Sequence, residues 1–225
     1  MAEHYSDQEQ IEALRRWWKQ YGAAIALALV LGVGSWFGWQ QWQQARESRA
    51  QAAALVYEEM QAAIAGAPVE QLAADRLATA TARAEQLKAE YGDTQYGALA
   101  GLMLARLAVA REDLEAAAAE LQSVMADGAD PDLALLARLR LVRVRTAQER
   151  YDEALQLAAV EVPAAIAAEF AEARGDIHRL RGDLDAAREA YQAAVDAARG
   201  TGMLAELLRI KLDQVQPAAT PGDAS

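Results

Sequence analysis

Hydrophobic residues near the amino terminus of this chain form a continuous stretch instead of an amphipathic pattern. No charged residue occurs between Lys19 and Arg46, and the apolar side chains between them would point in all directions from a helix. All five tryptophans of the chain lie at the two ends of this stretch. A helix from Trp17 to Trp39 would rise about 33 Å, close to the thickness of bilayer hydrocarbon, and aromatic rings favour the headgroup level. The pattern predicts a transmembrane helix over residues 21–43.

The residues beside this span predict that it is retained and which way it faces. The glutamines that follow it offer no small-x-small cleavage site, so we expect an anchor and not a removed signal peptide. Three basic residues precede the span and two follow it: Arg15, Arg16 and Lys19, then Arg46 and Arg49. This excess predicts a cytoplasmic tail over residues 1–20 and export of the long remainder. The alternative, a buried central helix of a soluble protein, leaves the absence of tryptophan from the rest of the chain unexplained.

Small residues inside the span offer a candidate surface for helix packing. Gly34 and Gly38 form a GxxxG pair, and Gly32 continues a row of small side chains that includes Ala24 and Ala28. Such rows let a second helix approach closely, although glycine and alanine are also common in spans without a partner. We therefore take Gly32, Gly34 and Gly38 as candidate helix-packing residues.

The pattern after the span is amphipathic, and it repeats. Residues 44–215 are rich in Ala, Leu, Glu, Arg and Gln, which favour helices. Three segments resemble one another: REDLEAA at 111–117, ERYDEAL at 149–155 and RGDLDAA at 181–187. Their equivalent positions, Leu114, Tyr151 and Leu184, lie 37 and 33 residues apart, which brackets the 34-residue period of the tetratricopeptide repeat. Each repeat of that kind is a pair of antiparallel helices.

The last copy of the repeat predicts how its two helices pack. Small side chains at Gly175 and Ala187 would let the helices touch, Gly182 would allow the turn, and Leu184 and Tyr191 would fill the seam. An additional hairpin is predicted before the repeats, with one helix over 45–64 and its return over 69–91. A capping helix is predicted over 203–215 and a disordered tail over 216–225. The predicted fold is thus all-α, with one transmembrane helix followed by a tetratricopeptide-like solenoid.

Charge and the rarer residues exclude several kinds of function. The chain has no cysteine, and only His4 and His178 could act as bases near neutral pH. His178 has no serine–aspartate arrangement or second metal ligand at helical spacing, and His4 lies in the amino-terminal tail. We therefore expect no enzyme, cofactor or metal site. The net charge of −11 belongs to the part after Arg49 and would repel nucleic acid and anionic headgroups.

Repeat geometry supplies candidate binding residues. The first helix of each repeat lines the concave face of such arrays, which places Leu99, Leu102, Arg106 and Val109 there. If exposed, they would suit apolar stretches of unfolded chain, but core packing is the alternative for the leucines. A run of arginines in the second repeat allows two readings, a solvated face paired with glutamates or a groove for acidic segments. Its members are Arg138, Arg140, Arg143, Arg145 and Arg150, of which we take Arg143 as a candidate.

The chain resembles the YfgM family, the ancillary subunit of the bacterial SecYEG translocon, over roughly residues 3–215. The most distinctive segments are QIEALRRWWKQYG at 10–22, LVLGVGSWFGWQQW at 29–42 and TQYGALAGLMLARLAVAREDLEAAAAEL at 94–121. The resemblance implies a single-pass type II protein of the bacterial inner membrane, with a cytoplasmic amino terminus and a periplasmic repeat domain.

The resemblance also implies partners. They are the SecYEG translocon, a membrane-anchored periplasmic chaperone of the PpiD type, and unfolded exported polypeptides that the protein would pass to periplasmic chaperones. Membrane lipid is a further expected partner, from the apolar span itself. The family has no catalytic residues to carry over. A function of another class remains open, a membrane-tethered scaffold whose repeats sequester a signalling or cell-division regulator.

Overall fold

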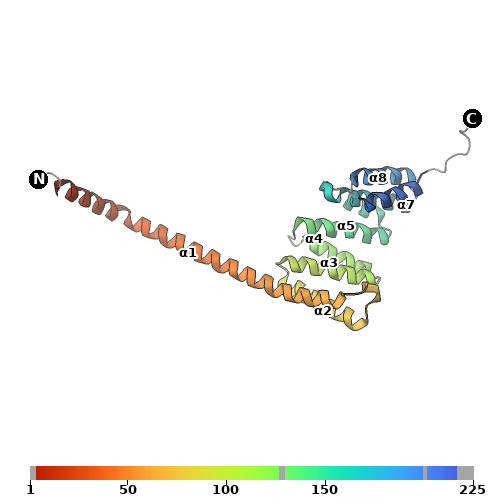
Figure 1. The fold of residues 1–225 in the computed structure, drawn as a ribbon, viewed down its shortest axis with the longest axis horizontal. Helices are drawn as coiled ribbons and strands as arrows, with labels where there is room; N and C mark the ends of the chain where they lie inside the picture. The colour runs from red at the N-terminus through yellow and green to blue at the C-terminus, as the bar shows by residue number, and fades with distance from the viewer. Residues whose placement is uncertain (1–3, 127–129, 200–201, 217–225) are drawn as a thin grey trace, which may run out of the picture. The chain divides into compact units, whose positions relative to one another are not determined.

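The computed structural model describes residues 4–126, 130–199 and 202–216, with the side chains of residues 4–10, 13, 24–26, 28 and 30 outside that description. The chain divides into two compact units, Met1–Ala52 and Ala53–Ser225, which we call the amino-terminal unit and the repeat unit. The longest helix, α1, runs from His4 to Ile64 (Figure 1). The predicted tail from residue 217 onward lies outside the described residues.

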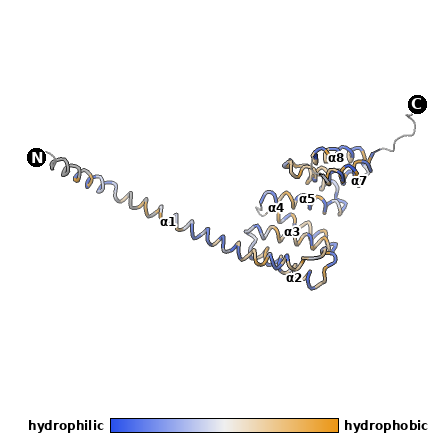
Figure 2. Tube along the Cα trace, viewed as in Figure 1, coloured by the Kyte–Doolittle hydropathy of each residue, from blue (hydrophilic) through white to orange (hydrophobic). Residues whose placement is uncertain are grey.

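The described residues of the amino-terminal unit, 4–52, are helical, and most of their described apolar side chains are exposed. Leu27, Leu31 and Phe37 are each more than 60% exposed, and Trp36 is 70% exposed. Figure 2 shows the hydropathy along α1. Within the described part of the chain, no helix has a stretch long and apolar enough to cross a membrane. The structure confirms that residues 21–43 are helical, and it does not confirm that they span a membrane.

The repeat unit is built from antiparallel helices that each pack against the next along the chain (Figure 1). Within the residues that the structure describes, every regular element is a helix, as the sequence predicted. The α-helices that follow α1 are α2 Ala74–Tyr91, α3 Gln95–Ala110, α4 Leu114–Ala126, α5 Pro131–Ala147, α6 Tyr151–Ala158, α7 Ala167–Arg181, α8 Leu184–Ala197 and α9 Met203–Gln214. Two short 3₁₀ helices, η1 Val69–Gln71 and η2 Ala164–Ile166, precede α2 and α7.

The predicted repeat register is confirmed at the start of each second helix. Helices α4, α6 and α8 begin at Leu114, Tyr151 and Leu184, the three positions that the sequence repeats align. Two residues before each start, the backbone adopts a left-handed conformation, with φ of 61° at Glu112, 59° at Glu149 and 81° at Gly182. The three turns therefore share one geometry, although only the last has the glycine that this conformation favours.

Replacing Glu149 by glycine is expected to stabilise the chain. A residue with a Cβ atom pays roughly 1–2 kcal/mol in the left-handed region, and glycine avoids most of this cost while losing some entropy of its own. We expect Glu149→Gly to raise the free energy of unfolding by about 1 kcal/mol in a urea titration of the full chain followed by circular dichroism. Gly182→Ala should lower it by a similar amount. A loss of stability in Glu149→Gly would contradict the shared turn geometry.

The core of the repeat unit lies between successive helices and begins inside α1. Ala53 and Met60 of α1 pack on Ala84 and Leu87 of α2, so the predicted additional hairpin is present. Further clusters centre on Leu121 between α3, α4 and α5 and on Phe170 between α5, α6 and α7. Each pair thus covers the apolar face of its neighbour, which is how helical repeats form a continuous core.

The predicted capping helix α9 covers α7 and α8. Leu208 and Leu212 are buried against these two helices, whereas Met203, Leu207 and Ile210 on the outer face are exposed. The outer face of this cap is therefore mixed, because these three apolar side chains lie among exposed polar ones such as Glu206 and Arg209.

The seam between α7 and α8 is filled by Tyr191, which is fully buried as predicted. The prediction that Leu184 also fills it is wrong, because Leu184 is 50% exposed. It is the first residue of α8, directly after the turn between the two helices.

Candidate binding groove

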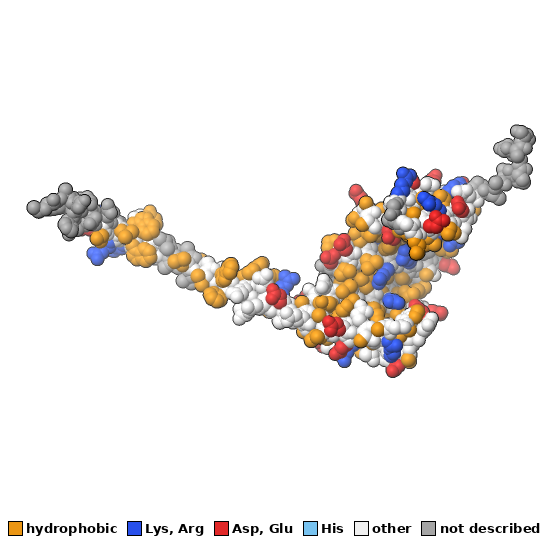
Figure 3. Space-filling model, viewed as in Figure 1, with side chains coloured by type: hydrophobic (Ala, Val, Ile, Leu, Met, Phe, Trp, Pro, Cys, Tyr) orange, Lys and Arg blue, Asp and Glu red, His pale blue; other side chains and the backbone are white. Residues whose placement is uncertain are grey.

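A groove of about 330 Å³ runs between α3, α4 and α5 in the repeat unit. Buried side chains of Ala105, Leu121 and Val144 form its floor, one from each helix. Val109, 44% exposed, and the exposed Ala147 line it nearer the surface. Figure 3 shows Lys and Arg side chains among apolar ones on a hollowed face of this unit. The groove thus offers apolar surface to a ligand, edged by positive charge.

Three arginines edge the apolar floor: Arg106 from α3, and Arg140 and Arg143 from α5. Arg140 and Arg143 lie three residues apart, so they are on the same face of α5. Arg143 Nη2 is 3.8 Å from Glu172 Oε2, a long ion pair. Among the residues that the structure describes, Arg106 and Arg140 form no ion pair. Burial lowers the pKa of Arg140, and the positive charges of Arg106 and Arg143 lower it further.

A second hollow of about 450 Å³ continues the groove between α5, α7, α8 and α9. The two share Arg143 and Ala147, so one surface extends across both. The second hollow has mixed charge, because Asp176 lies near Lys211 and Arg179 in its lining. The lining of the first groove, in contrast, combines three arginines with no acidic residue.

The structure brings together three of the five residues that the sequence offered as candidates for binding. Arg106, Val109 and Arg143 line the groove. Leu102 is only 4% exposed and belongs to the core, and Leu99 is partly buried against the same cluster. For both leucines, therefore, the alternative of core packing holds.

On the α5 wall of the groove, sequence reasoning identified Arg143 but did not single out Arg140, Val144 or Ala147. Val144 and Ala147 follow Arg140 and Arg143 by four residues, a spacing that puts each pair on one helix face. The sequence had named Arg140 only as one member of the arginine run. The helical spacing of these residues in the sequence could have shown that they share one face of α5.

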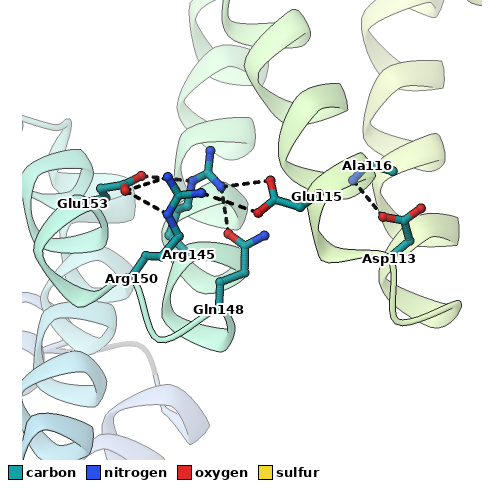
Figure 4. A network of polar contacts seen from close by, with 7 residues as sticks. All are labelled: Asp113, Glu115, Ala116, Arg145, Gln148, Arg150 and Glu153. Carbon is teal, nitrogen blue, oxygen red and sulfur yellow. Dashed lines mark hydrogen bonds and ion pairs between the residues drawn. The ribbon is translucent and has the colours of Figure 1, made fainter.

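Some arginines of the run in the second repeat pair with glutamates, and others line the groove. Arg145 is 6% exposed and lies with Arg150 between two glutamates, as Figure 4 shows. Arg145 is 3.5 Å from Glu153 and 3.7 Å from Glu115, and Arg150 is 2.7 Å and 3.5 Å from the same two residues. These contacts join α4, α5 and α6. Arg145 and Arg150 are therefore structural, while Arg140 and Arg143 face the groove.

The remaining candidate residues are not part of the groove lining. A Cβ atom added at Gly32, Gly34 or Gly38 would meet nothing within 4 Å, so the helix surface at each has room for a neighbour, and helix packing there stays a prediction. His178 Nδ1 lies 3.6 Å from Asp183 Oδ2, and the side chain of His4 is outside the described residues. Across the described residues, no group of three His, Cys, Asp or Glu side chains is arranged to hold a metal ion.

Paired helices in register, with a lined groove on one face, define a tetratricopeptide-like repeat protein. The family model of the tetratricopeptide repeat-like domain matches residues 15–217. The chain is 33% identical over 210 residues to the ancillary SecYEG translocon subunit of Escherichia coli K12, covering 93% of this chain and 97% of that protein.

A second relative extends the match. The ancillary SecYEG translocon subunit of Haemophilus influenzae is 27% identical over 215 residues, covering 96% of this chain and all of that protein. No solved structure was found that matches the chain. The chain belongs to the family of ancillary SecYEG translocon subunits, which confirms the YfgM-family resemblance of its sequence. This membership points to a non-catalytic scaffold.

Proposed function

We propose that this chain is a single-pass accessory subunit of the SecYEG translocon in the bacterial inner membrane. The observation that carries the proposal is the 33% identity to a translocon subunit over nearly the whole of both chains. Because the match covers 93% of this chain, it includes most of α1 as well as the repeats. Association with the translocon is therefore proposed for the full chain.

The amino-terminal unit would supply the membrane anchor. Residues between Lys19 and Arg46 carry no charge, and apolar side chains such as Leu29, Leu31 and Trp39 are about 60% exposed. Apolar surface of this kind favours lipid, and the tryptophans would lie near the headgroups. The excess of basic residues before the span supports a cytoplasmic amino terminus and a periplasmic repeat unit.

The repeat unit would bind other proteins through its groove. Apolar surface that stays accessible on a folded repeat unit suits segments of another chain. In a periplasmic subunit beside the translocon, such segments would come from newly exported polypeptides or from a membrane-anchored chaperone of the PpiD type. The chain would then hold exported polypeptides and pass them to periplasmic chaperones.

Purification of the tagged full chain from native membranes in mild detergent tests this proposal. We expect subunits of the translocon and a PpiD-type chaperone to co-purify, while an equally tagged, unrelated single-pass inner-membrane protein recovers neither. A reporter fused after Ser225 should be active only in the periplasm. Absence of translocon subunits in several detergents, or a reporter active only in the cytoplasm, would overturn it. Recovery of a signalling regulator alone would favour the scaffold alternative.

A further inference from the structure

We propose that the groove between α3, α4 and α5 recognises an acidic amphipathic segment of a partner protein. Carboxylates of this segment would pair with Arg106, Arg140 and Arg143, and its apolar side chains would cover Val109 and Ala147. This inference rests on the proposed function, because it names the chemical class of segment that the same groove would bind.

The unpaired charges of the groove are the first observation that supports it. The chain has 33 acidic and 22 basic residues, so carboxylates are plentiful. Other arginines of the repeat unit use them: Arg181 lies 2.7 Å from Asp152, and Arg188 lies 2.8 Å from Asp185. Arg106 and Arg140 have no such neighbour in the described part of the chain. Their charge is available to a ligand, and each hydrogen bond to a carboxylate would be charge-assisted.

The free groove also holds like charges close together. Arg140 is partly buried, and its pKa is lowered first by that burial and then by Arg106 and Arg143. Both effects disfavour the charged guanidinium while the groove is empty. An anionic ligand would reverse the second effect, so binding would remove a repulsion that the free protein carries. Functional sites often hold such unfavourable interactions, because ligand binding offsets them.

The apolar lining decides between a small anion and a chain segment. A phosphate or a free carboxylate would meet the arginines but leave Val109 and Ala147 in water. Side chains of a peptide would cover these residues and gain apolar burial in addition to the ion pairs. The groove also continues through Arg143 into the second hollow, so there is room for a segment longer than one or two residues. Both features favour a peptide over a small ion.

Charge-matched peptides test this inference with the full chain in nanodiscs of zwitterionic lipid. The first labelled peptide is helix-forming and has Glu and Leu on one face; the second replaces every Glu by Lys; the third replaces every Leu by Ser. In fluorescence anisotropy we expect the first to bind at least about tenfold more tightly than the second, and more tightly than the third. Its affinity should fall as salt rises. Equal binding of the first two peptides would overturn the inference.

Variants locate the binding on the protein. The double variant Arg106→Gln with Arg140→Gln should weaken binding of the acidic peptide at least about tenfold. Arg138→Gln makes the same change two residues from Arg140 on α5, outside the lining of the groove, and should bind as the unmodified chain does. Unchanged affinity in the double variant would overturn the inference.

Stability measurements separate loss of the site from loss of the fold. Because Arg140 repels its neighbours, Arg140→Gln is expected to keep or raise the midpoint of thermal unfolding while it weakens binding. Arg106→Gln, at an exposed position, gives a second variant in case Arg140→Gln lowers that midpoint.

Translocon recovery is scored separately from peptide binding, so the two proposals can fail independently. If the double variant binds the peptide normally and translocon subunits still co-purify, the groove inference fails and the proposed function stands. If peptide binding depends on the arginines but no translocon is recovered, the proposed function fails and the groove assignment stands.

Discussion

Lys211→Met is expected to lower the free energy of unfolding by about 3 kcal/mol, because it takes from a mostly buried carboxylate its nearest cation and leaves only the long ion pair with Arg143. Lys211 Nζ on α9 donates to Glu172 Oε1 at 2.7 Å and to Asp176 Oδ2 at 2.9 Å, both on α7. The Glu172 side chain is only 12% exposed. The Tyr191 hydroxyl donates to Asp176 Oδ1 at 2.6 Å, so the contacts tie α9 to both helices beneath it. Chemical denaturation of the full chain measures the loss.

A matched variant on the same helix isolates this effect. Arg209 pairs with Glu206 at 3.5 Å, but both side chains are more than 60% exposed, so Arg209→Met should cost less than about 0.5 kcal/mol. Adding Glu172→Gln to Lys211→Met should recover about 1–2 kcal/mol, since the uncompensated charge is then removed. Equal losses for Lys211→Met and Arg209→Met would show that the buried pair does not hold the cap in place.

The pH dependence of this contact follows from its pKa shift. Burial lowers the pKa of Lys211, but hydrogen bonds to Glu172 and Asp176 outweigh this and raise it above the ordinary 10.5. A raised pKa means that the stabilisation is fully present below the ordinary value and is lost as pH rises through the folded-state value. The penalty of Lys211→Met should therefore stay constant from about pH 6 to pH 9 and shrink only in stronger alkali.

The repeat register could be predicted from the sequence because local chemistry sets it. Asp113 and Asp183 cap their helices through backbone amides of Ala116 and Ala186, and each does so one residue before a helix that the alignment had placed. Left-handed turns precede all three of these helices, yet two of them carry glutamate. The turn is therefore imposed by the packing of the helix pair, and a search for glycine alone would have found only Gly182.

The role of each arginine could not be predicted in the same way. Arg140 and Arg145 lie five residues apart on α5, so they point to different sides of the helix. What each meets depends on helices from other parts of the chain: Glu115 and Glu153 reach Arg145, whereas Arg140 faces Arg106. The spacing of residues within one helix predicts on which face of that helix a side chain lies. Whether that face is paired or open is decided by tertiary packing.

Gly175→Ala is expected to lower the free energy of unfolding by about 2 kcal/mol, because the seam between α7 and α8 has no room for a methyl group. A Cβ atom at this position would lie 2.5 Å from both Cδ1 and Cε1 of Tyr191. The ring is fully buried and its hydroxyl is held by Asp176, so it cannot turn away. Overpacking of this kind costs roughly 1–3 kcal/mol, and the better helix propensity of alanine offsets up to about 1 kcal/mol of it.

The same substitution in a Tyr191→Leu background tests this cause. Leucine is smaller at the contact, so Gly175→Ala should there be neutral or stabilising by up to about 1 kcal/mol, although Tyr191→Leu is itself destabilising. The two changes should therefore be strongly non-additive in chemical denaturation. If Gly175→Ala cost the same in both backgrounds, the ring would not be the obstacle, and the close approach of α7 and α8 would depend on some contact other than Gly175 with Tyr191.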